Sequence, residues 1–543
     1  MQRLTESYFA ATDEAPLLET SCASILREAA LQWPDAVALI DADDTPPARR
    51  RWSYAELHQR AERTARALLA NFEPGSHIAI WAANCPEWIV LQFGLAMAGM
   101  VMVTINPANR VSELGYVLGQ SRSRAVFHQR HYRGVDMAQS IAAATQEHDL
   151  ELARVVCLEH FDDFLNEANA DCLLPAVAPQ DPAMIQYTSG TTGRPKGALL
   201  NHFSVTNNAR MMAELKSLNE NTVNLAVAPL FHTGGCVAGV LGSVQTGGAL
   251  LLPSAFDAAS MLDLIEQEQA TYTFAVPTML VALLAEQSSR PRDLSSLETV
   301  FSGAATVPVE VVKRVEQEFN ARLIIGYGQT ETSPAITHTR LDDAPDDKSE
   351  TIGCALPQVE VKIVDPESGA TMPVGHPGEL LTRGFLVMMG YYEMPEATAA
   401  TIDDDGWLHT GDLCSMDERG YCRITGRLKD MIIRGGENIY PREIEEVLYA
   451  HEAIEEVAVI GLPDDHWGES VAAVLRLCEG EPVRSQTLEN HVGASLARYK
   501  VPRRWFAMTE IPATASGKLQ KYKLVDMFKE GTLQKFELPC RGA

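Results

Sequence analysis

One stretch of the chain, residues 187–197, combines glycines, hydroxyl residues and two cations in the order Tyr-Thr-Ser-Gly-Thr-Thr-Gly-Arg-Pro-Lys-Gly. Glycines let backbone N–H groups turn toward an anion, hydroxyls add donors, and lysine and arginine add positive charge. Apolar runs at 184–187 and 198–200 predict two strands that this loop joins. A flexible linker is the alternative, but linkers seldom place two cations beside a pair of strands. The stretch therefore predicts a polyphosphate-binding loop, with the candidate residues Thr188, Ser189, Gly190, Thr191, Thr192, Gly193 and Lys196.

This loop is not a Walker A motif. Pro195 stands where that motif needs glycine, and Gly197 rather than Ser or Thr follows Lys196.

A second candidate segment, Gly-Tyr-Gly-Gln-Thr-Glu at 326–331, follows an apolar strand-like run. Tyr327 between glycines can lie flat against a purine, and the hydroxyl of Thr330 can bond a phosphate or carboxylate oxygen. The carboxylate of Glu331 can hold Mg²⁺ against phosphates. A simple glycine-bounded turn is the alternative. Ser-Gly-Ala at 302–304 ends another predicted strand, and ligands of open α/β sheets collect at such ends.

Three more charged residues lie beside glycines later in the chain. Asp412 ends the run Trp-Leu-His-Thr-Gly-Asp, and a buried-edge carboxylate accepts two hydroxyl hydrogen bonds well, as a ribose would require. Arg427 follows Gly426, and Lys518 follows Gly517 in Ile-Pro-Ala-Thr-Ala-Ser-Gly-Lys. Each has a simple alternative, a turn aspartate or a solvated surface cation.

These segments, in this order, resemble the signature motifs of the adenylate-forming superfamily, which includes acyl-CoA synthetases, peptide-synthetase adenylation domains and beetle luciferases. The resemblance spans roughly residues 52–521, with mild departures at Ala198 and Leu519. It implies binding of ATP and Mg²⁺ and a carboxylate substrate. The implied roles are adenine contact for Gly303, Ala304 and Tyr327, α-phosphate or carboxyl contact for Thr330, Mg²⁺ binding for Glu331 with Thr188, ribose contact for Asp412 and Arg427, and catalysis of adenylation for Lys518.

The same resemblance implies a second half-reaction with coenzyme A. Lys429 stands where the superfamily has a hinge, and Gly435, Gly436 and Glu437 match a loop that lines a pantetheine tunnel in a rotated arrangement. His232, in Pro-Leu-Phe-His-Thr-Gly-Gly-Cys, matches the segment beside the acyl pocket and would gate the pocket or orient the thiol. A packed core histidine beside Phe231 is the alternative.

The composition excludes some classes of partner. The 543 residues carry a formal net charge of −27, and such a field opposes general binding to nucleic acid or to an anionic membrane. The ten cysteines form no C-x-x-C pair, so they indicate neither a zinc site nor a disulfide framework. This pattern fits a protein of the reducing cytoplasm. No signal peptide is expected at the N-terminus. The uncharged run 89–105 is interrupted by glycines and predicts a buried helix and strand rather than a membrane span.

The pattern of elements predicts an α/β enzyme with two domains. Short apolar strands alternate with helices up to about residue 350, which is typical of a mainly parallel sheet. Short strands separated by Gly and Pro then predict a small barrel-like β unit. After Gly426 the texture becomes α+β. We therefore expect an N-terminal adenylate-forming domain at 1–428 and a mobile C-terminal domain at 429–543.

The sequence says less about which carboxylic acid is activated and which molecule accepts the acyl group. Amino-acid-activating relatives place an aspartate shortly after the segment of His232, but 236–241 reads Cys-Val-Ala-Gly-Val-Leu. The glycines at 234, 235, 239 and 242 and the residues Val276, Thr278 and Met279 suggest a roomy apolar pocket. This favours a medium- or long-chain fatty acid or a bulky hydrophobic acid. The alternatives are an acyl-AMP ligase that loads a carrier protein, a luciferase-like oxygenase and a non-catalytic adenylate-binding regulator; the oligomeric state, a homodimer included, is left open.

Overall fold

This computed structural model describes residues 3–43, 49–188, 195–303, 307–434, 437–464, 466–478, 483–513 and 519–533. Its backbone contacts divide the chain into two units. The large unit comprises Phe9–Val361 and Thr382–His409, and the small unit comprises Met1–Tyr8, Lys362–Leu381 and Thr410–Ala543.

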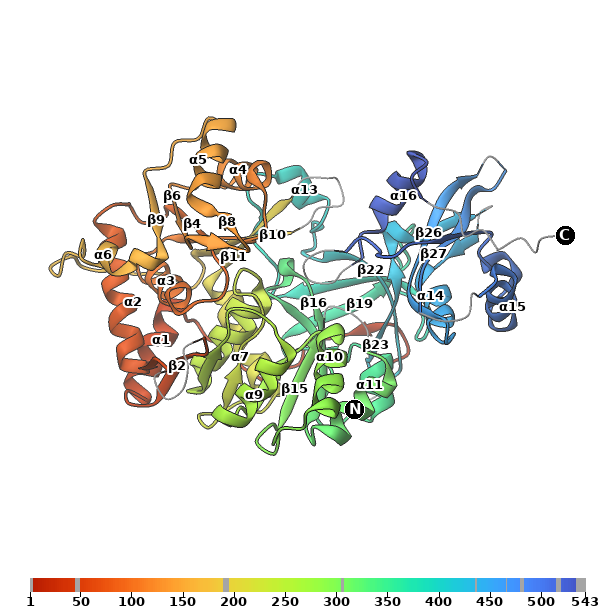
Figure 1. Cartoon of the computed structure of the whole chain (residues 1–543), viewed down its shortest axis with the longest axis horizontal. Coiled ribbons are helices and arrows are strands. Elements are labelled where there is room, and N and C mark those ends of the chain that lie inside the picture. Colours follow the sequence, from red (N-terminus) through yellow and green to blue (C-terminus); the bar gives the residue numbers. More distant parts are fainter. Residues whose placement is uncertain are drawn as a thin grey trace. The chain divides into compact units, whose positions relative to one another are not determined.

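The first sheet of the large unit has seven strands in the order β21-β11-β10-β5-β4-β6-β9. Of these, β4, β6, β9, β10 and β11 are labelled in Figure 1. The strands from β10 to β9 run parallel, whereas β10, β11 and β21 pair antiparallel at one edge. The predicted strands on both sides of the phosphate loop are therefore confirmed as β10 and β11. The bounds are β21 Gly390–Tyr391, β11 Lys196–Asn201, β10 Pro182–Thr188, β5 Val101–Ile105, β4 His77–Trp81, β6 Ala125–His128 and β9 Arg154–Cys157.

The uncharged run 89–105 forms the buried helix α3 (Pro86–Met97) and the buried strand β5, as predicted. Pro86 begins α3, where its missing N–H costs no hydrogen bond. The helix packs against α2 (Tyr54–Leu69), which begins with a reciprocal capping box of Ser53 and Glu56. Within the described residues, no helix combines the length and the apolar character that crossing a membrane requires.

The second sheet of the large unit has nine strands in the order β18-β17-β16-β15-β14-β12-β13-β2-β3. Its central strands, from β16 to β2, run parallel. Helices α9 (Ala258–Glu268), α10 (Pro277–Ser289) and α11 (Val309–Glu318) contribute to one apolar core with these strands. The bounds are β18 Cys354–Ala355, β17 Ala335–His338, β16 Arg322–Gly328, β15 Thr299–Gly303, β14 Tyr272–Phe274, β12 Val223–Leu225, β13 Ala249–Leu252, β2 Val37–Asp41 and β3 Arg51–Ser53.

Other helices complete the large unit, together with a small hairpin of β7 (His131–Tyr132) and β8 (Val135–Asp136). They are α1 Cys22–Gln32, α4 Val111–Gln120, α5 Met137–Glu147, α6 Phe161–Leu165, α7 His202–Leu215, α8 Gly242–Thr246, α12 Pro345–Glu350 and α13 Pro395–Ala399.

A third sheet has the order β1-β19-β20-β22-β23. Its first and last strands do not pair with each other, so the β unit expected to be barrel-like is an open sheet. The alternation of apolar and polar residues predicted its strands, but closure depends on how far they tilt and shift in register, which the alternation does not define. The bounds are β1 Tyr8–Phe9, β19 Val359–Val364, β20 Gly378–Gly384, β22 Leu408–Met416 and β23 Cys422–Arg427.

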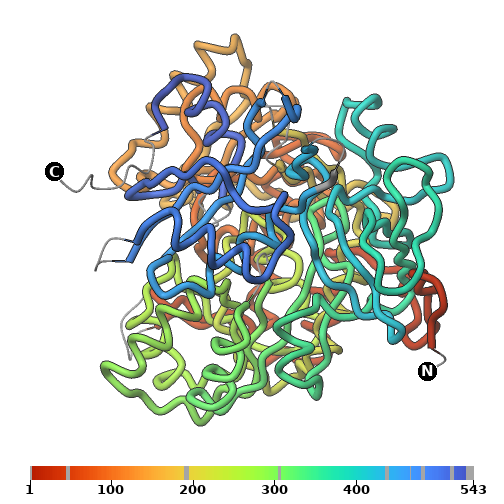
Figure 2. The backbone as a smooth tube through the Cα atoms, turned by 90° about the vertical axis from the view of Figure 1, so that its right-hand side faces the viewer, coloured from red at the N-terminus to blue at the C-terminus, as the bar shows by residue number. Residues whose placement is uncertain are grey.

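The C-terminal part of the small unit is a separate α+β module, drawn as the blue tube in Figure 2. Alternate residues of β26 (Ile454–Asp464) point to opposite faces of its sheet, as the two-residue period of a strand requires. Val457 and Val459 join a core with α14 and α15, whereas Ala458 and Ile460 join a core with α16. The other bounds are β24 Ile432–Arg434, β25 Glu437–Ile439, β27 Gly468–Leu477, β28 Arg504–Ala507, α14 Pro441–Tyr449, α15 Ser485–Ser495 and α16 Lys521–Lys529.

Candidate nucleotide and acyl site

The hairpin of β10 and β11 places two predicted phosphate-site residues opposite each other. Thr188 is the last residue of β10, Lys196 is the first of β11, and the two are paired in the antiparallel register. The other residues predicted to bind phosphate lie outside the described residues: Ser189, Gly190, Thr191, Thr192 and Gly193.

Glu331 lies next to this hairpin, although more than a hundred residues separate it from Thr188. It belongs to the short 3-10 turn Thr330–Thr332 that follows β16, and its side chain is buried. The hydroxyl of Thr188 donates to Oε1 of Glu331 at 3.3 Å. Thr188 and Glu331, which the motifs predict as joint magnesium ligands, therefore lie within hydrogen-bond distance of each other. Thr330 begins the same turn and is half-buried.

Tyr391 is a member of this cluster that the sequence reasoning missed. Its hydroxyl donates to Oε1 of Glu331 at 2.8 Å, and the ammonium of Lys196 lies 4.8 Å from the centre of its ring. We call Thr188, Lys196, Glu331 and Tyr391 the Glu331 cluster. A tyrosine after a glycine near 390 carries no motif of its own, so only the strand pairing of β21 with β11 reveals it.

The Glu331 cluster has the donor chemistry of a magnesium–phosphate site. Magnesium prefers oxygen ligands and commonly uses one or two carboxylates together with substrate phosphates. The cluster offers one buried carboxylate, two hydroxyls and one cation. No group of three or more His, Cys, Asp or Glu side chains that could hold a metal alone occurs in the described ranges. The residues therefore fit an ion that arrives with a polyphosphate.

The predicted adenine segments are adjacent strand ends of the nine-stranded sheet. Gly303 at the end of β15 pairs with Gly326 of β16, and a Cβ on Gly303 would lie 2.7 Å from the carbonyl oxygen of Gly326. Tyr327 follows Gly326, is half-buried and pairs with Thr337 of β17. Ala304 lies outside the described residues. The two strand ends are thus direct neighbours in the sheet, and their contact with adenine stays a prediction.

Replacing Gly328 by alanine is expected to strain the end of β16. A Cβ there would lie 1.9 Å from the carbonyl oxygen of Pro334, so the backbone must shift. Overpacking of this kind costs roughly 1–3 kcal/mol. We expect a lower melting temperature in scanning calorimetry. Gly493→Ala in α15 is the control, since its Cβ would make an ordinary 3.8 Å contact with Val501; equal melting temperatures for the two variants would contradict the steric assignment.

The two predicted ribose residues pair within the small unit. Asp412 of β22 and Arg427 of β23 face each other in the antiparallel register, and Nε of Arg427 lies 3.0 Å from Oδ1 of Asp412. The carboxylate is buried, whereas the guanidinium is one-third exposed. The amide of Asp412 donates to Oγ1 of Thr410, two residues earlier in β22, at 3.1 Å.

Lys429 lies in a 3-10 turn, Leu428–Asp430, directly after β23. Burial lowers the pKa of its ammonium. Gly435 and Gly436 lie outside the described residues, and the backbone of Glu437 pairs with Arg434 at the start of β25. Lys518 also lies outside them; the nearest described residues, Ala513 and Leu519, form an isolated antiparallel bridge.

The segment of His232 leads into a π-helix, Gly234–Leu241, a form of widened helix that is frequent at functional sites. The ring of His232 packs 4.4 Å from that of Phe231, and burial lowers the pKa of His232 to about 4, so the imidazole is neutral at pH 7. Sγ of Cys236 accepts from the side-chain amide of Gln186 at 3.2 Å. Because Gln186 lies on β10, this segment packs beside the strand that ends at Thr188.

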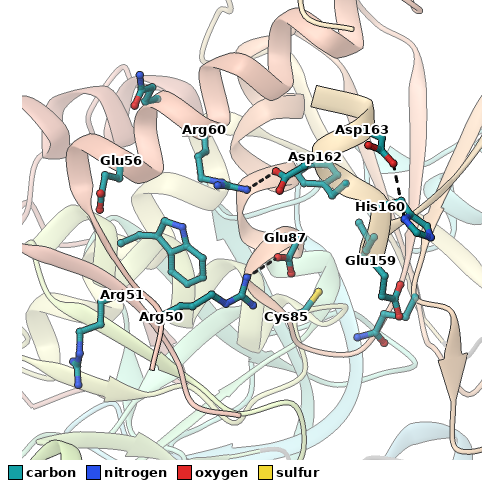
Figure 3. A pocket seen from close by; sticks show the side chains of 15 residues that line it. Arg50, Arg51, Glu56, Arg60, Cys85, Glu87, Glu159, His160, Asp162 and Asp163 are labelled. Carbon is teal, nitrogen blue, oxygen red and sulfur yellow. Dashed lines mark hydrogen bonds and ion pairs between the residues drawn. The ribbon is translucent and has the colours of Figure 1, made fainter. Parts of the chain in front are cut away.

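A cleft elsewhere in the large unit, of about 880 Å³, contains none of the predicted site residues (Figure 3). Its charged side chains neutralise one another: Arg50 pairs with Glu87 at 3.5 Å, and Arg60 pairs with Asp162 at 2.9 Å. Glu159 adds a further carboxylate. This cleft offers no concentrated positive charge for a nucleotide.

Comparison with known proteins identifies the family of this chain. Residues 26–392 match the AMP-binding enzyme family, and residues 443–518 match the AMP-binding enzyme C-terminal domain. The chain therefore belongs to the AMP-binding, adenylate-forming enzyme family, and its mixed α/β fold with several sheets and a C-terminal domain is the one predicted. Within that family it is an acyl-CoA ligase, an enzyme that joins an acid to a thiol through an acyl-adenylate.

Two relatives and two solved structures support this assignment. The chain is 40% identical to the Bacillus subtilis protein named "Putative acyl-CoA synthetase YngI", over 96% of this chain and 99% of that protein. It is 34% identical to the mitochondrial medium-chain acyl-CoA ligase ACSF2 of Danio rerio, over 96% and 90%. ATP-bound MatB from Rhodopseudomonas palustris has a TM-score of 0.85 at 28% identity and covers 94% of this chain and 100% of its own. Bacillus subtilis o-succinylbenzoate CoA synthetase (MenE) with its acyl-adenylate intermediate has a TM-score of 0.83 at 29% identity and covers 96% and 100%.

Proposed function

We propose that the protein activates a medium- or long-chain fatty acid, or another bulky hydrophobic acid, with Mg·ATP and transfers the acyl group to coenzyme A. The observation that carries the nucleotide part is the Glu331 cluster, where residues from three distant segments meet beside the phosphate loop. The acid class is supported by the absence of a carboxylate in 236–241 and by the medium-chain name of one group of relatives.

In the first half-reaction a carboxylate oxygen of the acid attacks the α-phosphorus of ATP, and the bond to pyrophosphate breaks. Lys196 and the loop at 188–193 hold the phosphates, and Thr330 orients the α-phosphate or the carboxyl. Tyr327, Gly303 and Ala304 hold the adenine, while Asp412 and Arg427 hold the ribose. Lys518 stabilises the negative charge that develops in the pentavalent transition state.

Glu331 and Thr188 would hold a magnesium ion together with the phosphates, and the ion would neutralise charge on the leaving pyrophosphate. The hydrogen bond from Thr188 and the burial of Glu331 orient the carboxylate before the nucleotide binds.

In the second half-reaction the thiol of coenzyme A attacks the acyl carbonyl, and AMP leaves. For this step residues 429–543 act as a mobile domain that turns about Lys429 relative to 1–428, and Gly435, Gly436 and Glu437 line the path of the pantetheine. His232, whose imidazole is neutral at pH 7, orients the thiol or gates the acyl pocket. We place the enzyme in the cytoplasm, since the nine cysteines within the described ranges are free thiols. The proposal also includes assembly into a homodimer.

A screen of AMP release tests the acid class. We expect octanoate, palmitate or a polycyclic acid to give a far higher kcat/KM than acetate, because an apolar pocket gains transfer free energy with each buried methylene, about 0.8 kcal/mol. AMP should form together with an acyl-CoA thioester, and removal of oxygen should change nothing. Preference for acetate would contradict the acid class, and an oxygen requirement would favour a luciferase-like oxygenase. Transfer to a carrier protein but not to coenzyme A would favour an acyl-AMP ligase.

A further inference from the structure

The backbone of Tyr391 is held on two sides. Its strand β21 pairs with β11, so that Tyr391 lies opposite Ala198, and its amide donates to Oγ1 of Thr398 at 2.9 Å. Gly390 before it has φ of 137°, and a Cβ there would lie 2.9 Å from Cγ2 of Thr398. The position of Tyr391 is therefore fixed by its own strand and by α13 rather than by a ligand.

The hydroxyl of Tyr391 is oriented by a carboxylate. It donates to Oε1 of Glu331 at 2.8 Å, and the tyrosine side chain is largely buried. A phenol hydroxyl is protonated at neutral pH, so Tyr391 is the donor and the carboxylate is the acceptor. A hydrogen bond to an ionised acceptor is stronger than one to a neutral acceptor. One carboxylate oxygen of Glu331 is thus held, which restricts the rotation of the whole group.

The ring of the same tyrosine contacts a cation. The ammonium of Lys196 lies 4.8 Å from the ring centre, within the range of a cation–π interaction. Lys196 and Glu331, both described, form no ion pair with each other, although both contact Tyr391. If they did pair, the carboxylate and the ammonium would neutralise each other and neither would be directed to a nucleotide.

We propose that Tyr391 is a positioning residue of the Mg·ATP site, holding Glu331 through its hydroxyl and Lys196 through its ring and keeping the two charges from pairing. This inference rests on the proposed function, because it assigns Glu331 to the magnesium and Lys196 to the phosphates. The two contacts of Tyr391 are chemically separable, so each has its own consequence for binding.

The test is calorimetric titration of the full chain with ATP, once with Mg²⁺ and once with EDTA. Tyr391→Phe removes the hydroxyl and keeps the ring. We expect its affinity for Mg·ATP to fall roughly tenfold, in line with a lost hydrogen bond to a charged group, while its affinity for metal-free ATP stays within about twofold of the wild type. Tyr391→Leu also removes the ring, and we expect it to weaken the binding of metal-free ATP as well.

The neighbouring residue provides the matched control. Tyr392 is half-buried, its ring packs 4.9 Å from that of His77, and no described residue bonds its hydroxyl. Tyr392→Phe is therefore expected to bind both forms of ATP as the wild type does. Melting temperatures of all three variants show whether each is folded.

The outcomes separate two ideas. A Tyr391→Phe protein that is folded and binds Mg·ATP like the wild type, or that loses equal affinity with and without Mg²⁺, would overturn the role of Tyr391 alone. A wild-type protein that bound no Mg·ATP would overturn the proposed function and this role with it.

Discussion

Replacing Lys518 by alanine is expected to slow formation of the acyl-adenylate by roughly 10²–10³-fold, the usual effect of removing one group that stabilises transition-state charge. Thioester synthesis from added acyl-adenylate should continue, because that step does not pass through the pentavalent phosphorus. ATP–pyrophosphate exchange measures the first step, and thioester formation from synthetic acyl-adenylate measures the second. Lys518 lies outside the described residues, so its role rests on the sequence motif, and this comparison is its direct test.

Two further variants sharpen the result. Gly436→Leu is expected to do the opposite, sparing adenylation and blocking transfer to coenzyme A, since a bulky side chain would fill the proposed tunnel. Lys523→Ala, an exposed lysine on α16, serves as the control for removing a cation from the same region. If Lys518→Ala impaired both steps equally, the lysine would have a structural role instead.

Replacing Lys216 by methionine is expected to stabilise the protein, more at pH 7 than near pH 10. Lys216 follows α7 and is fully buried; its ammonium lies 3.2 Å from the hydroxyl of Tyr272 and 4.6 Å from the ring centre of Phe301. Burial lowers its pKa to about 7 from the ordinary value of 10.5. Between pH 7 and pH 10.5 the lysine is protonated in the unfolded chain but largely neutral in the native state. The native state therefore loses stability as the pH falls through this range.

The expected gain at pH 7 follows from this difference in pKa. It is on the order of 4 kcal/mol, reduced by the lost contacts with Tyr272 and Phe301. Urea unfolding at pH 7 and pH 10 measures it. Lys313→Met, on the partly exposed lysine of α11 that pairs with Glu310, is the control for the same substitution outside the core. A Lys216→Met protein that is less stable than the wild type by the same amount at both pH values would contradict the explanation.

Sequence patterns predicted the local elements well. The β-branched and apolar runs on both sides of the phosphate loop, and the run 101–105, became strands. The motif at 326–331 singled out Glu331, whose carboxylate accepts a hydrogen bond from Thr188; its binding of magnesium stays a prediction. These features depend on residues that are close in sequence or on a recognisable combination of motifs, so they can be predicted from the sequence alone.

Long-range pairings were not predictable in the same way. Tyr391 reaches Glu331 only because the two-residue strand β21 joins β11, and so short a strand has no periodicity to detect. Lys216 looks like an ordinary surface lysine at the end of a helix, and its burial follows from the sheet around Tyr272 and Phe301. The open third sheet likewise depends on how its strands pair, which their alternating pattern leaves undetermined.

The C-terminal module has an apolar interior on each face of its sheet, one under α14 and α15 and one under α16. The module is therefore stabilised by its own two cores. A change in the orientation of the whole module would leave both cores intact. A domain that changes its orientation during a catalytic cycle, as we propose for residues 429–543, needs its own core. A segment that depended on a neighbouring domain for its packing would unfold locally each time the two separated.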